Sequence, residues 1–110
     1  MRDFRKQSNC VYNCRYHIVL PTKYRKKIFN ESVFAFFKKC ILQMHDYYPD
    51  LWIEEQNHDK DHVHIMMIIP PKYSVGKVVG IIKANTSRAM KKEVAFLKKC
   101  YFGTDGIWSD

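Results

Sequence analysis

The sequence lacks the features of membrane-spanning, secreted and disulfide-stabilised proteins. No apolar run approaches the roughly 18 residues that a transmembrane helix needs. Residues 1–7 are charged and no apolar stretch follows, so we expect no signal peptide. Cys10, Cys14, Cys40 and Cys100 form no CxxC pair, which indicates reduced thiols in a cytosolic protein. Cys10 and Cys14 are compatible with half of a zinc site, but a second half with ligand spacing is missing. Internal repeats and low-complexity segments are also missing.

Positive charge and aromatic residues are abundant instead. Among 110 residues, 19 Lys and Arg oppose 11 Asp and Glu, which gives a net charge of +8. Hydrophobic residues make up 46% and aromatic residues 15%, enough for one folded domain over residues 1–110. A domain this basic commonly binds a polyanion, and nucleic acid is the first candidate. The alternative is a solvated basic surface that only keeps the protein soluble.

Hydrophobic periodicity predicts the order strand, helix, strand, strand, helix, strand. Residues 10–20 and 62–69 alternate as strands do, and 51–56 forms a hairpin with the latter. Apolar residues recur at helical spacing between Asn30, an N-cap, and Pro49, and again after Ser74. Residues 107–110 resemble the start of a fourth strand. This order predicts an α+β, ferredoxin-like (RRM-like) antiparallel sheet with two helices on one face.

His62 and His64 are the candidate metal ligands. They lie two residues apart on a predicted strand, so they share a face with Cα atoms about 6.5–7 Å apart. Two imidazoles at that distance can converge on one divalent cation. The alternative is a pair of histidines on a half-wetted sheet face.

A basic turn and an open sheet face indicate nucleic-acid binding. Lys23, Arg25, Lys26 and Lys27 surround Tyr24, so these cations can contact phosphates while the ring stacks on a base. The alternative for this turn is a solvated loop. Further candidate phosphate contacts are Arg15 on the first strand, and Lys83 and Arg88 on the second helix. An open basic sheet face of this kind binds single-stranded nucleic acid in other folds.

An ordered set of motifs resembles one family. His62-Val63-His64 is a His-hydrophobic-His (HUH) motif. Tyr16-His17-Ile18-Val19 and Thr22-Lys23-Tyr24-Arg25 precede it, and Gly80-Ile81-Ile82-Lys83, Thr86-Ser87-Arg88 and Trp108 follow it. Over essentially the whole chain, this set resembles the small single-tyrosine HUH transposases of bacterial and archaeal insertion sequences. The related REP-associated transposases have flanking segments that are less similar.

The resemblance implies a transposase for single-stranded DNA. Such proteins bind hairpins at the element ends, and a tyrosine cleaves the strand to form a 5′-phosphotyrosine. Mg²⁺ or Mn²⁺, held here by His62 and His64, polarises the scissile phosphate, and no nucleotide cofactor is needed. The resemblance also implies a homodimer in the bacterial or archaeal cytoplasm, associated with the nucleoid and not with a membrane.

The sequence departs from the family at its end. There the nucleophilic tyrosine lies on a helix after the tryptophan strand, and a glutamine one turn later is the third metal ligand. This sequence ends at Asp110, before that helix. We therefore expect a truncated form or a decayed gene copy that is inactive alone, with Gln56, His58 or Asp61 as auxiliary ligands. The alternative function is a non-catalytic binding module for single-stranded DNA or RNA.

Overall fold

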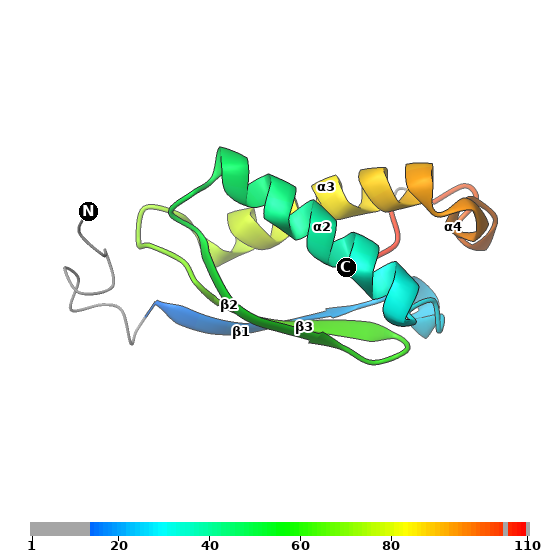
Figure 1. Cartoon of the computed structure of the whole chain (residues 1–110), viewed down its shortest axis with the longest axis horizontal. Coiled ribbons are helices and arrows are strands. Elements are labelled where there is room, and N and C mark those ends of the chain that lie inside the picture. Colours follow the sequence, from blue (N-terminus) through cyan, green and yellow to red (C-terminus); the bar gives the residue numbers. More distant parts are fainter. Residues whose placement is uncertain (1–13, 105, 110) are drawn as a thin grey trace.

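A three-stranded antiparallel sheet carries two long helices on one face (Figure 1). The computed structural model describes residues 14–104 and 106–109. The strands are β1 (Arg15–Pro21), β2 (Trp52–His58) and β3 (His62–Ile68), in the order β1-β3-β2. The helices are α2 (Glu31–Tyr47), α3 (Val75–Glu93) and α4 (Ala95–Cys100), and the 3-10 turn η2 (Lys23–Arg25) follows β1. The predicted α+β class, with both long helices on one face, is confirmed; residues 10–13 of the predicted first strand lie outside the described residues.

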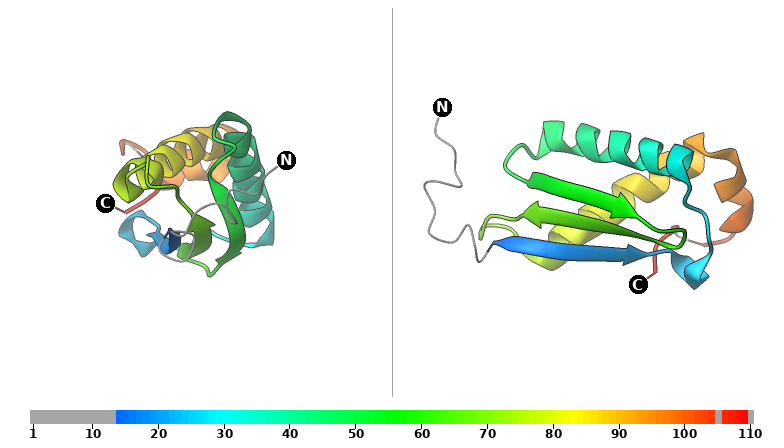
Figure 2. Two further views of the ribbon diagram at one scale, coloured as in Figure 1. Left: turned by 90° about the vertical axis from the view of Figure 1, so that its left-hand side faces the viewer. Right: turned by 60° about the horizontal axis from the view of Figure 1, so that its bottom comes forward.

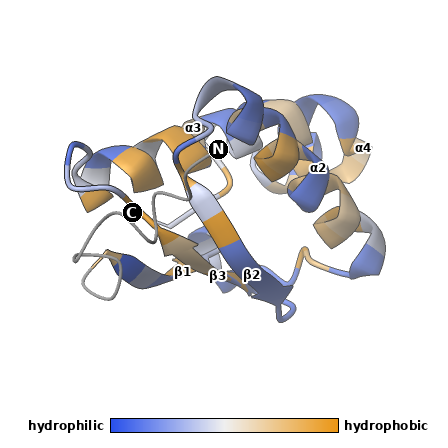
Figure 3. Ribbon diagram, turned by 60° about the vertical axis from the view of Figure 1, so that its left-hand side comes forward, coloured by the Kyte–Doolittle hydropathy of each residue, from blue (hydrophilic) through white to orange (hydrophobic). Residues whose placement is uncertain are grey.

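Alternation along the central strand decides which face the helices cover. Val63, Ile65 and Met67 of β3 are fully buried, and so are Phe37 of α2 and Ile82 of α3 above them. Burying each such side chain contributes about 1.5–3 kcal/mol. Figure 2 shows both long helices on the same side of the strands. Figure 3 shows long hydrophobic stretches in α3 and a hydrophilic loop between β2 and β3. The other face of the sheet carries the half-buried His62, His64 and Met66 and the fully buried Ile68.

Both predicted N-caps are confirmed. The side chain of Asn30 accepts a hydrogen bond from the Val33 amide at 2.9 Å at the start of α2. The side chain of Ser74 accepts one from the Lys77 amide at 3.1 Å at the start of α3. Among the described residues, every helix is too short or too polar to cross a lipid bilayer.

The predicted fourth strand is reduced to an isolated bridge between Trp108 and Thr22. It lies at the outer edge of β1, where the fourth strand of a ferredoxin-like sheet belongs. The segment is attached to α3 through side chains. The Trp108 indole donates to Thr86 Oγ1 at 2.9 Å, and the Ile107 amide donates to Ser87 Oγ at 3.2 Å. The backbone of the segment also pairs with the end of β1, since the Lys23 amide donates to the Ile107 carbonyl at 2.8 Å and the Ser109 amide to the Pro21 carbonyl at 2.9 Å.

We predict that Thr86→Val destabilises the protein by about 1–3 kcal/mol, because the buried Trp108 indole loses its acceptor. Thr86→Ser is the matched control, since it keeps the hydroxyl. Urea denaturation measures both. A Thr86→Val variant at least as stable as Thr86→Ser would contradict this role.

Candidate metal and nucleic-acid site

Three histidines meet on the face of the sheet that the helices leave open. His62 and His64 of β3 lie with their ring centroids 4.6 Å apart and nearly perpendicular. His17 of β1 stacks on His64 at 5.2 Å. The pairing of β1 with β3 brings these rings together, because Val19 lies opposite His64 and Pro21 opposite His62. The predicted His62/His64 pair thus shares one face, and a third imidazole joins it.

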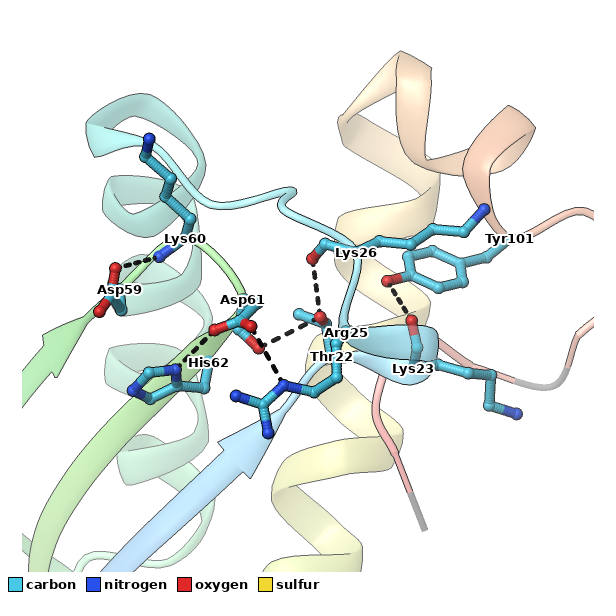
Figure 4. A network of polar contacts seen from close by, with 9 residues as sticks. All are labelled: Thr22, Lys23, Arg25, Lys26, Asp59, Lys60, Asp61, His62 and Tyr101. Carbon is cyan, nitrogen blue, oxygen red and sulfur yellow. Dashed lines mark hydrogen bonds and ion pairs between the residues drawn. The ribbon is translucent and has the colours of Figure 1, made fainter.

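His62 is oriented by a carboxylate. Its Nδ1 lies 2.7 Å from Asp61 Oδ1, and Arg25 Nε donates to Asp61 Oδ2 at 3.1 Å (Figure 4). These hydrogen bonds, first from His62 and then from Arg25, lower the pKa of the Asp61 carboxyl below its ordinary value. An ionised Asp61 only accepts, so His62 carries its proton on Nδ1. The Nε2 edge of His62 then has a lone pair available to a ligand.

His64 is oriented by another histidine. Its Nδ1 lies 3.1 Å from Nε2 of His17. Partial burial, followed by the neighbouring rings of His62 and His17, lowers the pKa of His64 below its ordinary value. The neutral form is the one that binds a metal ion. Ligating histidines in proteins commonly make such a second hydrogen bond through the other ring nitrogen.

Among the described residues, no third metal ligand of the usual kind joins the pair. Within residues 14–104 and 106–109, no group of three His, Cys, Asp or Glu side chains is placed to hold a metal ion. The auxiliary candidates Gln56 and His58 pair with Ile65 and Val63, both fully buried under the helices. Paired residues of an antiparallel sheet share a face, so Gln56 and His58 lie on the side of the sheet away from His64. Asp61, the remaining candidate, lies against His62 as its hydrogen-bond partner.

A register shift explains the position of Gln56. β2 pairs with β3 through Ile53 and then Glu55, so Glu54 is an extra residue in the strand. Such a bulge reverses the side-chain alternation that follows it. Strict alternation along residues 51–56 does not show the shift. Arg15 on the open face forms an ion pair with Glu54 at 2.8 Å.

The basic turn after β1 has a strained backbone. Tyr24 and Arg25 have φ angles of 62° and 51°, in the left-handed region that side-chain-bearing residues seldom adopt. Thr22 Oγ1 donates to the Lys26 carbonyl at 2.7 Å, and Tyr101 Oη donates to the Lys23 carbonyl at 3.0 Å. Tyr24 is 72% exposed, as base stacking requires. The strained turn thus directs Arg25 to Asp61 and leaves the Tyr24 ring in solvent.

The other predicted cations divide into two groups. Lys26 and Lys27 are exposed beside the turn, and Lys26 Nζ donates to the Cys100 carbonyl at 2.7 Å. Lys83 and Arg88 lie on α3, where they line a separate groove with Lys23. Lys23 thus belongs both to the basic turn and to this groove, whereas Lys26 and Lys27 are not among the residues that line it. The contribution of Tyr101 was not predicted, because nothing in the sequence links it to a turn 78 residues earlier.

Comparison with known proteins identifies the family. Residues 10–110 match the family model described as "Transposase IS200 like". The chain belongs to the family of IS200-like transposases. It is 30% identical over 105 residues to the transposases for insertion sequence element IS200 of Salmonella typhimurium and Salmonella typhi. The match covers 92% of this chain and 66% of each relative, so the chain spans about two thirds of their length.

A solved structure supports the fold of this chain. The crystal structure of a candidate transposase from Deinococcus radiodurans R1 matches with a TM-score of 0.75 at 22% sequence identity. The match covers 86% of this chain and 72% of the other. At that identity the likeness shows the shared fold alone.

We predict that Asp61→Ala moves neutral His62 toward the tautomer protonated on Nε2, because the acceptor at Nδ1 is lost. Long-range ¹H–¹⁵N correlation spectra above the histidine titration range measure the tautomer. Asp59→Ala is the matched control in the same loop, since the Asp59 carboxylate accepts from the Lys60 amide. Equal His62 spectra in the two variants would contradict the assignment.

Proposed function

We propose that this chain forms the DNA-binding and phosphate-activating part of a transposase that cleaves and rejoins single-stranded DNA. Its substrates are the hairpin ends of an insertion sequence, and the covalent intermediate is a 5′-phosphotyrosine. The observation that supports this most strongly is the pair His62 and His64 on an open sheet face, next to a cationic turn with an exposed Tyr24. Membership of the IS200-like transposase family supports the same chemistry.

The two histidines fit a divalent cation as two of its ligands. Asp61 and His17 occupy the Nδ1 atoms, so both rings can present Nε2. Mn²⁺ accepts imidazole more readily than Mg²⁺ does, and water or phosphate oxygens suit the remaining positions of either ion. When bound, the cation would polarise the scissile phosphate. Asp61 and His17 are then positioning residues.

Single-stranded DNA suits the surface beside the histidines. The Tyr24 ring is free to stack on an unpaired base, and Lys26 and Lys27 are exposed to phosphates. Arg25 forms an ion pair with Asp61, which is the hydrogen-bond partner of His62. The Arg25 guanidinium therefore lies close to the place where a phosphate at His62 would bind. A duplex keeps its bases stacked inside and would leave Tyr24 without a partner.

The attacking tyrosine is proposed to come from outside residues 1–110, within a homodimer. Tyr73 and Tyr101 donate their hydroxyls to Asp50 and to the Lys23 carbonyl, and neither touches the histidines. Burial raises the pKa of Tyr101, which further disfavours its phenolate. In the proposed step the tyrosine oxygen bonds to phosphorus, and the 3′ oxygen leaves as a hydroxyl.

We predict that Mn²⁺ broadens the NMR signals of His62, His64 and the adjacent His17 most strongly, and that His64→Ala abolishes the effect. His17→Ala should weaken Mn²⁺ binding about tenfold, because His64 loses the partner at its Nδ1. His45→Ala is the control, since His45 lies on α2 and bonds to the Leu51 carbonyl. Equal broadening in wild type and His64→Ala would eliminate the metal site.

We predict that residues 1–110 bind a single-stranded DNA hairpin more tightly than the matching duplex and form no covalent adduct with it. A chain extended by the tyrosine helix of the relatives should form a Mn²⁺-dependent 5′ adduct. Labelled DNA on a denaturing gel measures the adduct, and fluorescence anisotropy measures the affinity.

The outcomes separate the two candidate functions. An adduct formed by residues 1–110 alone would refute the proposed source of the nucleophile. Hairpin binding without any adduct, even in the extended chain, would leave the non-catalytic binding module as the function. Tighter binding of plain duplex would contradict both.

A further inference from the structure

A cationic groove lies apart from the histidines, along α3. It has a volume of about 700 Å³ and opens between α3, Lys23 and residues 106–109. Its cations are Lys23, Lys83, Arg88 and Lys91, and no Asp or Glu is among the described residues that line it. We call it the α3 groove. These four positive charges repel each other, so an anion that binds there relieves the repulsion.

The cations of the α3 groove are fixed by groups that do not neutralise them. Lys83 Nζ donates to the Ser109 carbonyl at 2.7 Å, and Lys91 Nζ to the Thr104 carbonyl at 3.1 Å. The Arg88 guanidinium donates to the Asn85 amide oxygen at 2.7 Å. Carbonyl and amide oxygens orient a cation but leave its net charge in place. The groove is therefore a preorganised anion site.

Two cations near the histidines, in contrast, are paired with carboxylates. Arg25 forms an ion pair with Asp61 at 3.1 Å, and Arg15 forms one with Glu54 at 2.8 Å. Among the described residues, no such carboxylate pairs with a cation of the α3 groove. In the part of the chain that the structure describes, the positive charge that a polyanion would meet is therefore less compensated in the α3 groove than beside the histidines. The sequence predicted phosphate contacts at the turn and also at Lys83 and Arg88.

The groove begins where the histidine site ends. Pro21 is the register partner of His62, and its carbonyl accepts a hydrogen bond from the Ser109 amide at 2.9 Å. Lys23, two residues after Pro21, lines the groove at that corner. One extended polyanion can therefore pass from His62 around the corner into the groove.

The lining selects phosphates over bases. Trp108 is the aromatic residue of the described lining, and it is 4% exposed, so it offers no stacking surface. Basic grooves without base contacts bind the strand independently of sequence. Tyr24 at the turn is exposed, so base contacts belong there and backbone contacts in the groove.

We propose that the α3 groove binds the sugar–phosphate backbone of the single strand that extends beyond the His62/His64 site. This rests on the proposed function and adds a second, sequence-independent part to the DNA-binding surface. The contribution must depend on strand length, because a short oligonucleotide can occupy the histidine site alone.

Ala84 provides the test, since it is exposed, lines the groove and makes no polar side-chain contact. Ala84→Glu introduces a negative charge, and Ala84→Gln is its matched neutral control. Fluorescence anisotropy with oligodeoxythymidylates of increasing length measures affinity at several salt concentrations. For long strands we expect Ala84→Glu to bind about threefold to tenfold more weakly than Ala84→Gln. The salt dependence should fall by about 0.7 units per lost phosphate contact, and short strands should bind equally.

Each result decides the proposal. Equal affinities of Ala84→Glu and Ala84→Gln for long strands would overturn the groove and leave the proposed function intact. A wild-type chain that binds no single strand of any length would overturn the proposed function, and the groove with it. If Ala84→Glu fails to fold, Arg88→Gln is compared with Lys92→Gln, an exposed cation one turn later that lies outside the groove lining. Weaker long-strand binding by Arg88→Gln alone supports the groove, and equal binding overturns it.

Discussion

Thr22 connects the parts of the molecule from which the site is built. It is fully buried, and its amide donates to the Asp61 carbonyl at 2.9 Å. Its hydroxyl lies 2.7 Å from the Lys26 carbonyl, which closes the basic turn, and 3.1 Å from the Asp61 carbonyl. Its backbone also forms the bridge to Trp108. The turn, the start of β3 and the segment 106–109 therefore share one point of attachment, and the geometry of both proposed DNA-binding surfaces depends on it.

The antiparallel pairing of β1 with β3 converts that attachment into a chemical site. It sets His17 beside His64 and ends β1 next to His62, so the cationic turn comes directly after the histidines. The helices cover the opposite face of the sheet, because the side chains of Val63, Ile65 and Met67 are buried there. A shift of β3 by one residue would bury the histidines and expose these apolar side chains, so the hydrophobic core protects the register of the site.

The two surfaces differ in how their positive charges are compensated. Asp61 both neutralises Arg25 and fixes the tautomer of His62, which suits the proposed binding of a metal ion and a phosphate. The groove along α3 has backbone carbonyls in the corresponding role, which orient Lys83 and Lys91 and retain their charge. The contacts of Asp61 favour precise positioning of the side chains, and the carbonyl contacts along α3 favour affinity for a polyanion.

Local patterns in the sequence were sufficient for much of this. Alternation in residues 62–69 determined that His62 and His64 share a face, and Asn30 and Ser74 determined where the long helices begin. The net charge of +8 predicted a polyanion as the partner. These features depend on neighbouring residues only, so they are visible without a fold.

Tertiary structure decided the contacts between distant segments. The extra residue Glu54 moved Gln56 and His58 to the covered face, although the pattern of residues 51–56 allowed the other assignment. The approach of His17 to His64 and of Tyr101 to Lys23 depends on strand register and on the packing of α4. The α3 groove exists because Lys23, 60 residues from Lys83 in the sequence, reaches the same corner as Ser109. Residue spacing carries no information about such encounters, because they are set by how the core packs.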